Sequence, residues 1–207
     1  MRPPAVPKFD SPLPRDFYER HVTEVARDLL GCYLVRRRGR SISGGRIVEV
    51  EAYGGPGDPG SHADRAPNGR ASIMFGEPGI AYVYFTYGMH HCMNAVCDHP
   101  GRGSAVLFRA LEPVWNVRAM RLGAPTNLAD HLVTCGPGRL CRALRIDRRQ
   151  YGSDLVTGPI RVLPGPRGSV AINESVRIGL TLDDDRPWRY WIDSPSVSRS
   201  PRPRSRR

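Results

Sequence analysis

Lysine is almost absent from this chain of 207 residues, in which Lys8 is the only example. The formal net charge is nevertheless +11, because nearly all of the basic residues are arginines. The scarcity of lysine leaves few amines that could form a Schiff base with a substrate. The positive charge favours a polyanionic partner, most simply nucleic acid, although five of the arginines lie in the terminal segment 199–207.

Other absences exclude further classes of protein. No apolar run is long enough to cross a membrane, and the polar, Pro-rich start of the chain lacks the apolar segment of a signal peptide. We therefore expect a cytoplasmic protein with no membrane partner. The glycine-rich loops that bind nucleotide phosphates are absent as well. Five cysteines in a chain without export signals are expected to be reduced and mostly buried.

The length suits a single domain with a sizeable core. Residues 1–14 are rich in proline, and residues 199–207 contain only arginine, serine and proline. Such segments cannot bury enough apolar surface to fold, so we expect two disordered tails around one domain over residues 15–198.

The periodicity of the apolar residues predicts a mixture of helices and strands. A first helix is expected over residues 22–30, with Thr23 as its cap and Gly31 at its end. A proline near the start of residues 113–122 and of residues 137–144 predicts two more helices there. Strands are expected at 32–36, 46–53, 80–87, 91–97, 104–111, 160–163, 176–182 and 190–193, with a turn at 39–45 and a long loop at 54–78. Without regular βαβ units, this order predicts an α+β fold with a largely antiparallel sheet.

The strand over residues 45–53 carries the first candidate site. Apolar residues recur at every second position, so Glu49, Glu51 and Tyr53 share the opposite face. A carboxylate beside an aromatic ring can hold a planar ligand and activate a water next to it. Two carboxylates on one face of one strand point the same way and cannot flank a sugar bond from both sides. This argues for one working carboxylate, with the alternative that this face is simply solvated.

The aromatic strand at 80–87 is followed by Gly88, which predicts a β-hairpin with Tyr87 at its tip. A ring at an exposed tip has no core to fill, and in a basic protein it suits insertion between stacked bases. Tyr82 and Tyr84 share a face of this strand, where aromatic side chains usually belong to the core.

Arg109 lies within an apolar strand and needs a buried acceptor. It either forms a structural ion pair, with Glu112 or elsewhere, or shares a buried site with Glu51. Asn94 lies in the return strand of the hairpin, where asparagine is uncommon, and is either a ligand contact or a satisfied core amide. His62 falls in the long loop. A metal site is disfavoured because the spacing of its candidate ligands matches no standard zinc pattern; these are His90, His91, Cys92, Cys97 and His99.

Together these features resemble the alkyladenine (3-methyladenine) DNA glycosylase family, the group that includes the mammalian alkylpurine DNA glycosylase. The resemblance covers roughly residues 17–198. The matching motifs are at residues 24–31, 45–53, 58–62, 74–75, 82–84, 87–89, 92–94, 107–113 and 136–141. The segment 63–72 follows the family pattern only loosely, and Pro195 is followed by Ser196 where the family has an aromatic residue.

The resemblance implies a fold and a reaction. The fold would be a single domain with a curved sheet, surrounding helices and a protruding hairpin. The protein would flip an alkylated or deaminated purine out of duplex DNA and hydrolyse its N-glycosidic bond, without cutting the strand. It would need no metal or cofactor, act as a monomer, and work on the DNA of a bacterial nucleoid.

The resemblance also assigns roles to residues. Glu51 would be the general base, and Arg109 and the main-chain carbonyl at Val197 would help to hold the water. The flipped base would lie between Tyr53 and Tyr84 and contact His62. Asn94 would select among purines, and Tyr87 would intercalate into the DNA. Glu49 receives no catalytic role and is expected to be a charged or ion-paired flank.

Two alternatives remain open. A nucleic-acid-binding module could keep this fold and lack catalysis, and it would bind DNA without releasing any base. A metal-dependent hydrolase would use His90, His91 and Cys92 and would be inhibited by chelators.

Overall fold

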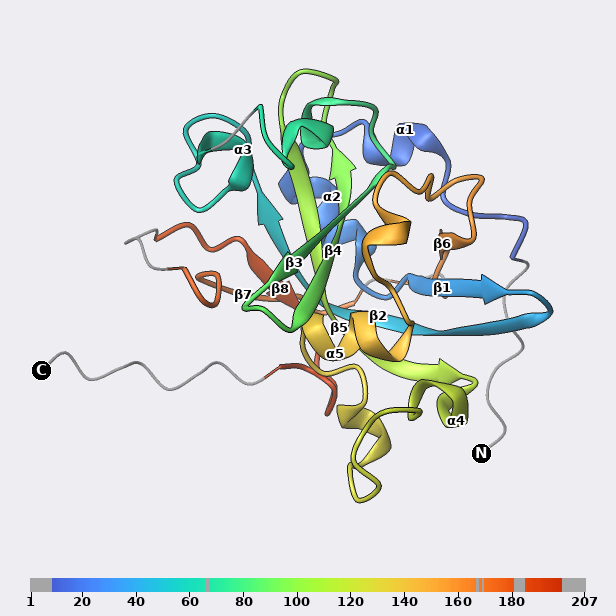
Figure 1. The fold of residues 1–207 in the computed structure, drawn as a ribbon. Helices are drawn as coiled ribbons and strands as arrows, with labels where there is room; N and C mark the ends of the chain where they lie inside the picture. The colour runs from blue at the N-terminus through green and yellow to red at the C-terminus, as the bar shows by residue number, and fades with distance from the viewer. Residues whose placement is uncertain (1–8, 66–67, 167, 169, 181–184, 199–207) are drawn as a thin grey trace, which may run out of the picture.

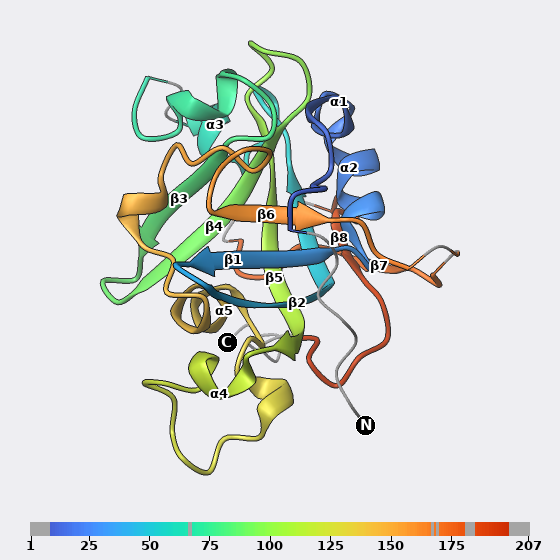
Figure 2. The same ribbon diagram turned by 90° about the vertical axis from the view of Figure 1, so that its right-hand side faces the viewer.

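The structure is a computed structural model, which describes residues 9–65, 68–166, 168, 170–180 and 185–198. Within these residues, eight strands form one sheet whose main order is β3-β4-β5-β2-β1-β6. The strands are β1 (Tyr33–Arg38), β2 (Ser41–Tyr53), β3 (Ala81–Thr86), β4 (His90–Cys97), β5 (Ser104–Trp115), β6 (Ile160–Leu163), β7 (Asn173–Ser175) and β8 (Arg189–Trp191). Each described strand pair is antiparallel, and the sheet is strongly curled (Figures 1 and 2). The expected α+β fold is confirmed.

Short helices surround the sheet. They are α1 (Arg15–Tyr18), α2 (Val22–Leu29), α3 (His62–Arg65), α4 (Val117–Met120) and α5 (Pro137–Ala143), with 3₁₀ turns η1 (Ser72–Phe75), η2 (Asp130–Leu132) and η3 (Arg148–Gln150). Figure 2 shows α1 and α2 on one flank of the sheet, with α4 and α5 below it. None of the helices in the described part of the chain is long and apolar enough to cross a membrane.

The middle of β2 is buried and has a neighbouring strand on each side. Residues 49–51 pair with β8, and the same stretch of β2 also runs against β5. Val48, Val50 and Ala52 are fully buried and join α2 and β5 in the main hydrophobic core. Because strand side chains alternate, Glu49, Glu51 and Tyr53 are directed away from these core residues. The alternation predicted from the sequence therefore places the candidate site on the second face of β2.

The hairpin predicted after residue 80 is confirmed. Strands β3 and β4 pair from Ala81 opposite Ala95 to Thr86 opposite His90, and the turn between them contains Tyr87 and Gly88. Tyr87 and Gly88 are the central residues of a tight turn in which the N–H of Met89 donates to the carbonyl of Thr86 at 3.2 Å, and both have a positive φ, +50° and +67°. The helix predicted after Gly136 is also present, as α5.

The predicted turn over residues 39–45 is wrong in its extent. Strand β2 begins at Ser41, and Gly44 and Gly45 lie inside it. A Cβ at Gly44 would lie 2.4 Å from the carbonyl oxygen of Leu34, and one at Gly45 would lie 2.1 Å from that of Glu112. The two glycines therefore allow neighbouring backbones to approach closely, which is a role of strand glycines that resembles a turn signal in sequence.

Three further expectations are corrected. The helix expected over 113–122 is limited to α4, because β5 continues through Pro113 to Trp115. The strand expected over 176–182 is absent from its described part, residues 176–180, where the backbone N–H of Ile178 binds a carboxylate instead. Helix α2 begins at Val22, so Thr23 lies within it and is not its cap.

The ends of the chain are described in part. Residues 1–8 and 199–207, which belong to the predicted disordered tails, lie outside the described residues. Within 9–14, Phe9 and Leu13 are buried, and the N–H of Leu13 donates to the carbonyl of Val162 at 2.8 Å. None of the five cysteines, all of which lie in the described part of the chain, forms a disulfide, and all except Cys135 are buried, as expected.

Candidate active site

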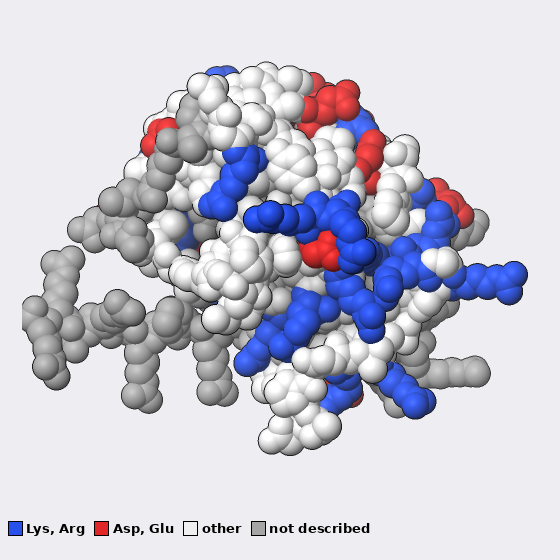
Figure 3. Space-filling view, viewed as in Figure 1, with Lys and Arg blue, Asp and Glu red and all other residues white. Residues whose placement is uncertain are grey.

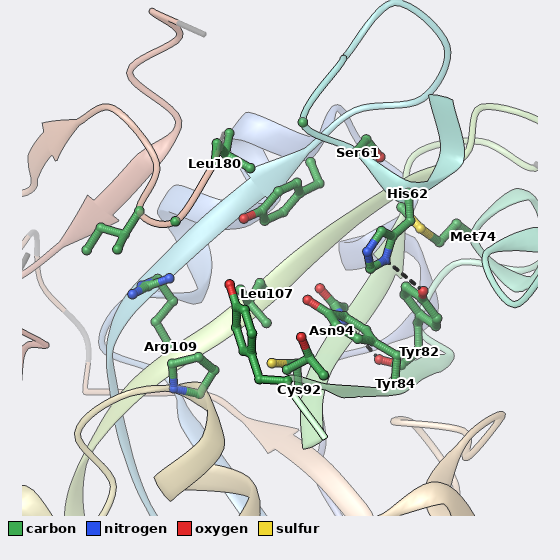
Figure 4. A pocket seen from close by; sticks show the side chains of 17 residues that line it. Ser61, His62, Met74, Tyr82, Tyr84, Cys92, Asn94, Leu107, Arg109 and Leu180 are labelled. Atoms are coloured by element: carbon green, nitrogen blue, oxygen red, sulfur yellow. Dashed lines mark hydrogen bonds between the residues drawn. The ribbon is translucent and has the colours of Figure 1, made fainter. Parts of the chain in front are cut away.

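A cavity of about 440 Å³ opens beside the second face of β2 (Figure 4). Its walls come from β2, from the loop that leads into α3, from the β3–β4 hairpin, from β5 and from residues 178–180. Of the residues predicted for the site, Tyr53, His62, Tyr84, Tyr87, Asn94 and Arg109 all line it. The fold thus brings together side chains that are up to 56 positions apart, between Tyr53 and Arg109, as the sequence predicted.

Glu51 lies directly behind this wall and is fully buried. Its Oε2 accepts hydrogen bonds from the hydroxyl of Tyr53 at 2.8 Å and from Nη1 of Arg109 at 3.0 Å. Its Oε1 accepts one from the backbone N–H of Ile178 at 2.7 Å. Each of these donors belongs to a residue that lines the cavity. The carboxylate is therefore held in one orientation beside the space that a ligand would occupy.

Arg109 binds both carboxylates of β2. Its Nε donates to Glu49 Oε1 at 2.8 Å, while Nη1 donates to Glu51. Burial lowers the pKa of Arg109, but the charges of Glu51 and Glu49 outweigh burial and raise that pKa above its ordinary value. Arg109 therefore forms a buried ion pair with Glu49 and also shares a buried site with Glu51, so the geometry fits both of the sequence-based alternatives. Its part in orienting a water remains a prediction.

Glu49 is fully buried, so its carboxylate is not solvated. The expectation that it is ion-paired is confirmed. It accepts hydrogen bonds from Arg109, from Nε of Arg189 at 2.8 Å, and from the N–H and hydroxyl of Ser198, both at 2.7 Å. Burial raises the pKa of Glu49, but Arg109, Ser198 and Arg189 together lower it below its ordinary value. Sequence reasoning missed this cluster, although the spacing of Glu49 and Glu51 on one face was a signal for it.

The aromatic side chains form a connected group. The ring of His62 packs edge-on against Tyr84, with centroids 4.7 Å apart, and its Nδ1 lies 2.9 Å from the hydroxyl of Tyr82. The rings of Tyr82 and Tyr84 are 5.3 Å apart. Burial raises the pKa of Tyr82 to about 12, and burial followed by the charge of Glu51 raises the pKa of Tyr53. These phenols stay protonated near neutral pH, so Tyr53 can donate to Glu51.

Asn94 is buried at the cavity wall, and its Nδ2 donates to the carbonyl of Tyr82 at 3.0 Å. The amide is thereby oriented by the neighbouring strand. The observation fits both of the sequence-based alternatives, because a satisfied amide can still present its oxygen to a ligand.

Tyr87 lies at the hairpin tip with 80% of its surface exposed, and it also borders the cavity. Met89, two residues along, is 70% exposed. The expectation of an exposed ring at the tip is confirmed, and insertion of that ring into DNA remains a prediction.

Val197 lies elsewhere. It borders a different hollow, shared with Cys135 and Arg139, and its carbonyl accepts a hydrogen bond from Cys135 Sγ at 3.6 Å. The next residue, Ser198, is bound to Glu49, so this segment is tied to the carboxylate strand. Its part in holding a water remains a prediction.

Within the residues that the structure describes, no group of three or more His, Cys, Asp or Glu could hold a metal ion. His90 and His91 face outward to different degrees, while Cys92 is buried at the cavity. The expectation that no metal is needed remains a prediction.

Exposed arginines gather on the face shown in Figure 3. The β1–β2 turn and the segment of α5 and η3 carry exposed arginines, among them Arg38, Arg142, Arg145, Arg148 and Arg149. Figures 1 and 3 share one viewpoint and show these segments on the same face as the β3–β4 hairpin. Positive potential therefore lies beside the exposed tip.

Comparison with known proteins gives a consistent assignment. Residues 16–196 match the family described as methylpurine-DNA glycosylase (MPG). A protein of Streptomyces avermitilis, named "Putative 3-methyladenine DNA glycosylase", is 45% identical over 205 residues, which is 95% of this chain and 96% of that protein. Proteins with the same name from Koribacter versatilis and Methanocella arvoryzae are 44% and 43% identical over 195 residues, covering 91% and 90% of this chain and 93% and 96% of theirs. The resemblance inferred from the sequence is confirmed, and the chain belongs to the methylpurine-DNA glycosylase family, a family of DNA glycosylases.

Proposed function

We propose that the protein is a monofunctional DNA glycosylase that removes alkylated or deaminated purines of the 3-methyladenine type from duplex DNA. The observation that carries the proposal is the buried Glu51 carboxylate, which is held by Tyr53, Arg109 and Ile178 at the wall of an aromatic cavity. Among the described residues Oε1 accepts a hydrogen bond only from Ile178, so it retains a lone pair that can accept the proton of a water.

The reaction needs the target base outside the helix. Chemistry on a stacked base requires its extrusion, which costs a few kcal/mol. Stacking of the flipped base on Tyr53 and Tyr84 returns about 1–3 kcal/mol, and alkylated purines that carry positive charge are attracted to such ring faces. His62 contacts the base, and Asn94 selects among purines by the shape and hydrogen bonding of the wall. Tyr87 fills the gap that the flipped nucleotide leaves.

Hydrolysis then follows from the position of Glu51. The bond between C1′ and the base nitrogen breaks, a C1′–oxygen bond to the water forms, and the proton of the water passes to the carboxylate. A cationic alkylated base leaves as a neutral molecule, so for this substrate one general base and tight positioning suffice. A neutral deaminated purine leaves as an anion and takes up a proton from the solvent. Arg109, which donates to Glu51 Oε2 at the cavity wall, helps to hold the water. The products are a free purine and an abasic site.

The reaction stops at the abasic site in this proposal. Cutting of the strand by a glycosylase commonly uses an amine that forms a Schiff base with the sugar. Lys8 is the only lysine of the chain, and no lysine occurs in the segments that form the cavity. One cavity per chain also suits action as a monomer.

Replacement of the carboxylate tests the proposal. Glu51→Gln is expected to abolish release of 3-methyladenine from methylated duplex DNA while the protein still binds DNA that contains an abasic site. Glu112→Gln is a matched control, because Glu112 lies on the adjacent strand β5 outside the cavity. Undiminished release by Glu51→Gln would refute the role of Glu51. Salt-sensitive DNA binding by the wild-type protein, without release of any base, would instead support a non-catalytic binding module.

A further inference from the structure

Arg177 lies directly behind Tyr53, and its side chain is fully buried. The centre of its guanidinium is 4.7 Å from the centroid of the Tyr53 ring and 5.4 Å from that of Trp188. Its Nη1 also donates to the carbonyl of Ala52 at 3.0 Å. Arg177 does not border the cavity, whereas Tyr53 does. The guanidinium therefore backs the ring of Tyr53 from the side away from the proposed base site.

Asp58 holds this guanidinium in place. Both Nη atoms of Arg177 donate to Asp58, each at 2.7 Å, in a bidentate pair that fixes the plane of the guanidinium. Asp58 also accepts from the backbone N–H of Gly54 at 2.7 Å and of Gly60 at 3.1 Å. Burial alone would raise the pKa of Asp58, but the hydrogen bonds from Arg177 and Gly54 lower it below its ordinary value. The pair thus ties residues 54–60, which lead to His62, to the back of Tyr53.

Arg177 also positions the backbone segment that donates a hydrogen bond to Glu51. The residue after it, Ile178, donates its N–H to Glu51 Oε1 at 2.7 Å, and residues 178–180 continue as a wall of the cavity. A Cβ on Gly60 would lie 2.8 Å from Arg177 Nη2 and from the side chain of Leu180, so these segments are in close contact. One buried ion pair therefore fixes an aromatic wall and a hydrogen-bond donor to the carboxylate.

We propose that Arg177 and Asp58 are positioning residues for the glycosylase reaction, which orient the Tyr53 ring and the Ile178 amide on Glu51. This inference rests on the proposed function. Neither residue touches the reacting atoms. We therefore expect their loss to lower the rate of base release, through the geometry of the bound complex, more than it lowers the affinity for DNA. A displacement of about 1 Å in such a site can lower the rate about 10²-fold.

Arg177→Lys and Arg177→Met test the proposal. Lysine keeps the charge beside Asp58 but has no planar guanidinium for the bidentate pair or for stacking on Tyr53. The assay is single-turnover base release from duplexes that contain 3-methyladenine, 7-methylguanine or hypoxanthine, using the lesion that the wild-type protein releases fastest. For both variants we expect release at saturating enzyme to fall about 100-fold, with less than about a threefold change in affinity for abasic-site DNA. Arg177→Lys is expected to melt close to the wild-type temperature, which separates positioning from stability.

Arg186→Met is the matched control. Arg186 also pairs with Asp58, at 3.0 Å, but its side chain is partly exposed and its guanidinium packs on the Trp188 ring, at 5.1 Å. We expect this variant to keep nearly the wild-type rate. If the two arginines merely neutralised Asp58, their variants would be impaired alike.

Coupling to Tyr53 gives the second readout. In a Tyr53→Leu background, Arg177→Met is expected to lower the rate by much less than it does alone, because much of its effect passes through the missing ring. A folded Arg177→Lys variant with the wild-type rate, or full additivity with Tyr53→Leu, would overturn the inference while leaving the proposed function intact. Failure of the wild-type protein to release base from every duplex would instead refute the proposed function, and this inference with it.

Discussion

Glu49 accepts a hydrogen bond from Nε of Arg109 at 2.8 Å, and neither side chain is more than a tenth exposed. The other edge of the same guanidinium donates to Glu51, so a single cation bridges two carboxylates two positions apart on β2. Because a guanidinium is planar and rigid, binding at Nε fixes the direction of Nη1. Glu49 therefore determines how Arg109 meets the proposed general base.

Glu49→Gln is expected to weaken both the fold and the reaction. In this variant the buried side chains of Arg109 and Arg189 lose the charge of Glu49. Breaking a buried ion pair lowers the free energy of unfolding by about 3–5 kcal/mol. We expect the free energy of unfolding in urea to fall by about 3 kcal/mol and single-turnover base release to fall about tenfold, a 1.4 kcal/mol effect on the barrier. Glu174→Gln, which removes the surface partner of Arg27, is the control and should cost less than about 1 kcal/mol. Equal stability losses in the two variants would contradict the buried network.

The same carboxylates predict how stability depends on pH. The pKa values of Glu49 and Asp58 are both lower in the folded protein than their ordinary values. A group of this kind contributes stability that is present above its unfolded pKa, about 4, and is lost as the pH falls through its folded pKa. We expect the melting temperature to fall steadily below about pH 4, and to fall less steeply in Glu49→Gln. Parallel curves for the two proteins would show that Glu49 is not a source of the acid dependence.

Tyr53→Phe separates the ring from its hydroxyl. The variant keeps the stacking surface but removes the donor that lies 2.8 Å from Glu51 Oε2. A hydrogen bond to a charged group contributes about 1.5–3 kcal/mol, so we expect base release to slow by about 10- to 100-fold while affinity for abasic-site DNA is unchanged. Tyr84→Phe is the matched control, because Tyr84 lines the same cavity and, among the described residues, the phenol that is hydrogen-bonded to Glu51 is that of Tyr53. A similar slowing in both variants would indicate that the hydroxyl of Tyr53 has no special relation to Glu51.

Local sequence patterns were sufficient for much of the fold. The alternation around Glu51, the glycine after Tyr87 and the proline at the start of α5 each fix a structure within a few residues, and each was predicted. The predictions were wrong where one sequence feature is typical of two different structures. Gly44 and Gly45 allow close approach of strands, yet paired glycines are equally typical of a turn. Pro113 lies near the end of a strand, although proline also starts helices.

The candidate site also contains residues that could be predicted from the sequence and residues that could not. The exposed position of the tip aromatic Tyr87 and the need of the strand arginine Arg109 for a buried acceptor could each be predicted from the sequence. The supporting partners could not, because their contacts join distant parts of the chain. Arg177 meets Asp58 across 119 positions, and Ser198 meets Glu49 across 149. In sequence these four are ordinary polar residues, and only their burial by the curled sheet makes them determinants of geometry.

Tyr87→Ala tests the role of the hairpin tip. The side chain is 80% exposed, so its removal should leave the melting temperature within about 2 °C of the wild type, as expected for surface substitutions. Stacking of an aromatic ring on bases is worth about 1–3 kcal/mol. We therefore expect affinity for duplex DNA with an abasic site to fall roughly 10- to 100-fold, measured by fluorescence anisotropy at fixed salt concentration.

The control for the tip is Leu122→Ala, because Leu122 is another exposed apolar side chain, at 60%, and lies just after α4 and away from the tip. This variant should bind DNA as the wild type does. The electrostatic part of binding should be preserved in both variants, since neither changes an arginine, so the slope of log affinity against log salt concentration should match that of the wild type. If the salt dependence of affinity changed in Tyr87→Ala, the hairpin would affect phosphate contacts. If the variant were unfolded, Tyr87 would belong to the core. Either result would contradict a ring that acts by stacking between bases.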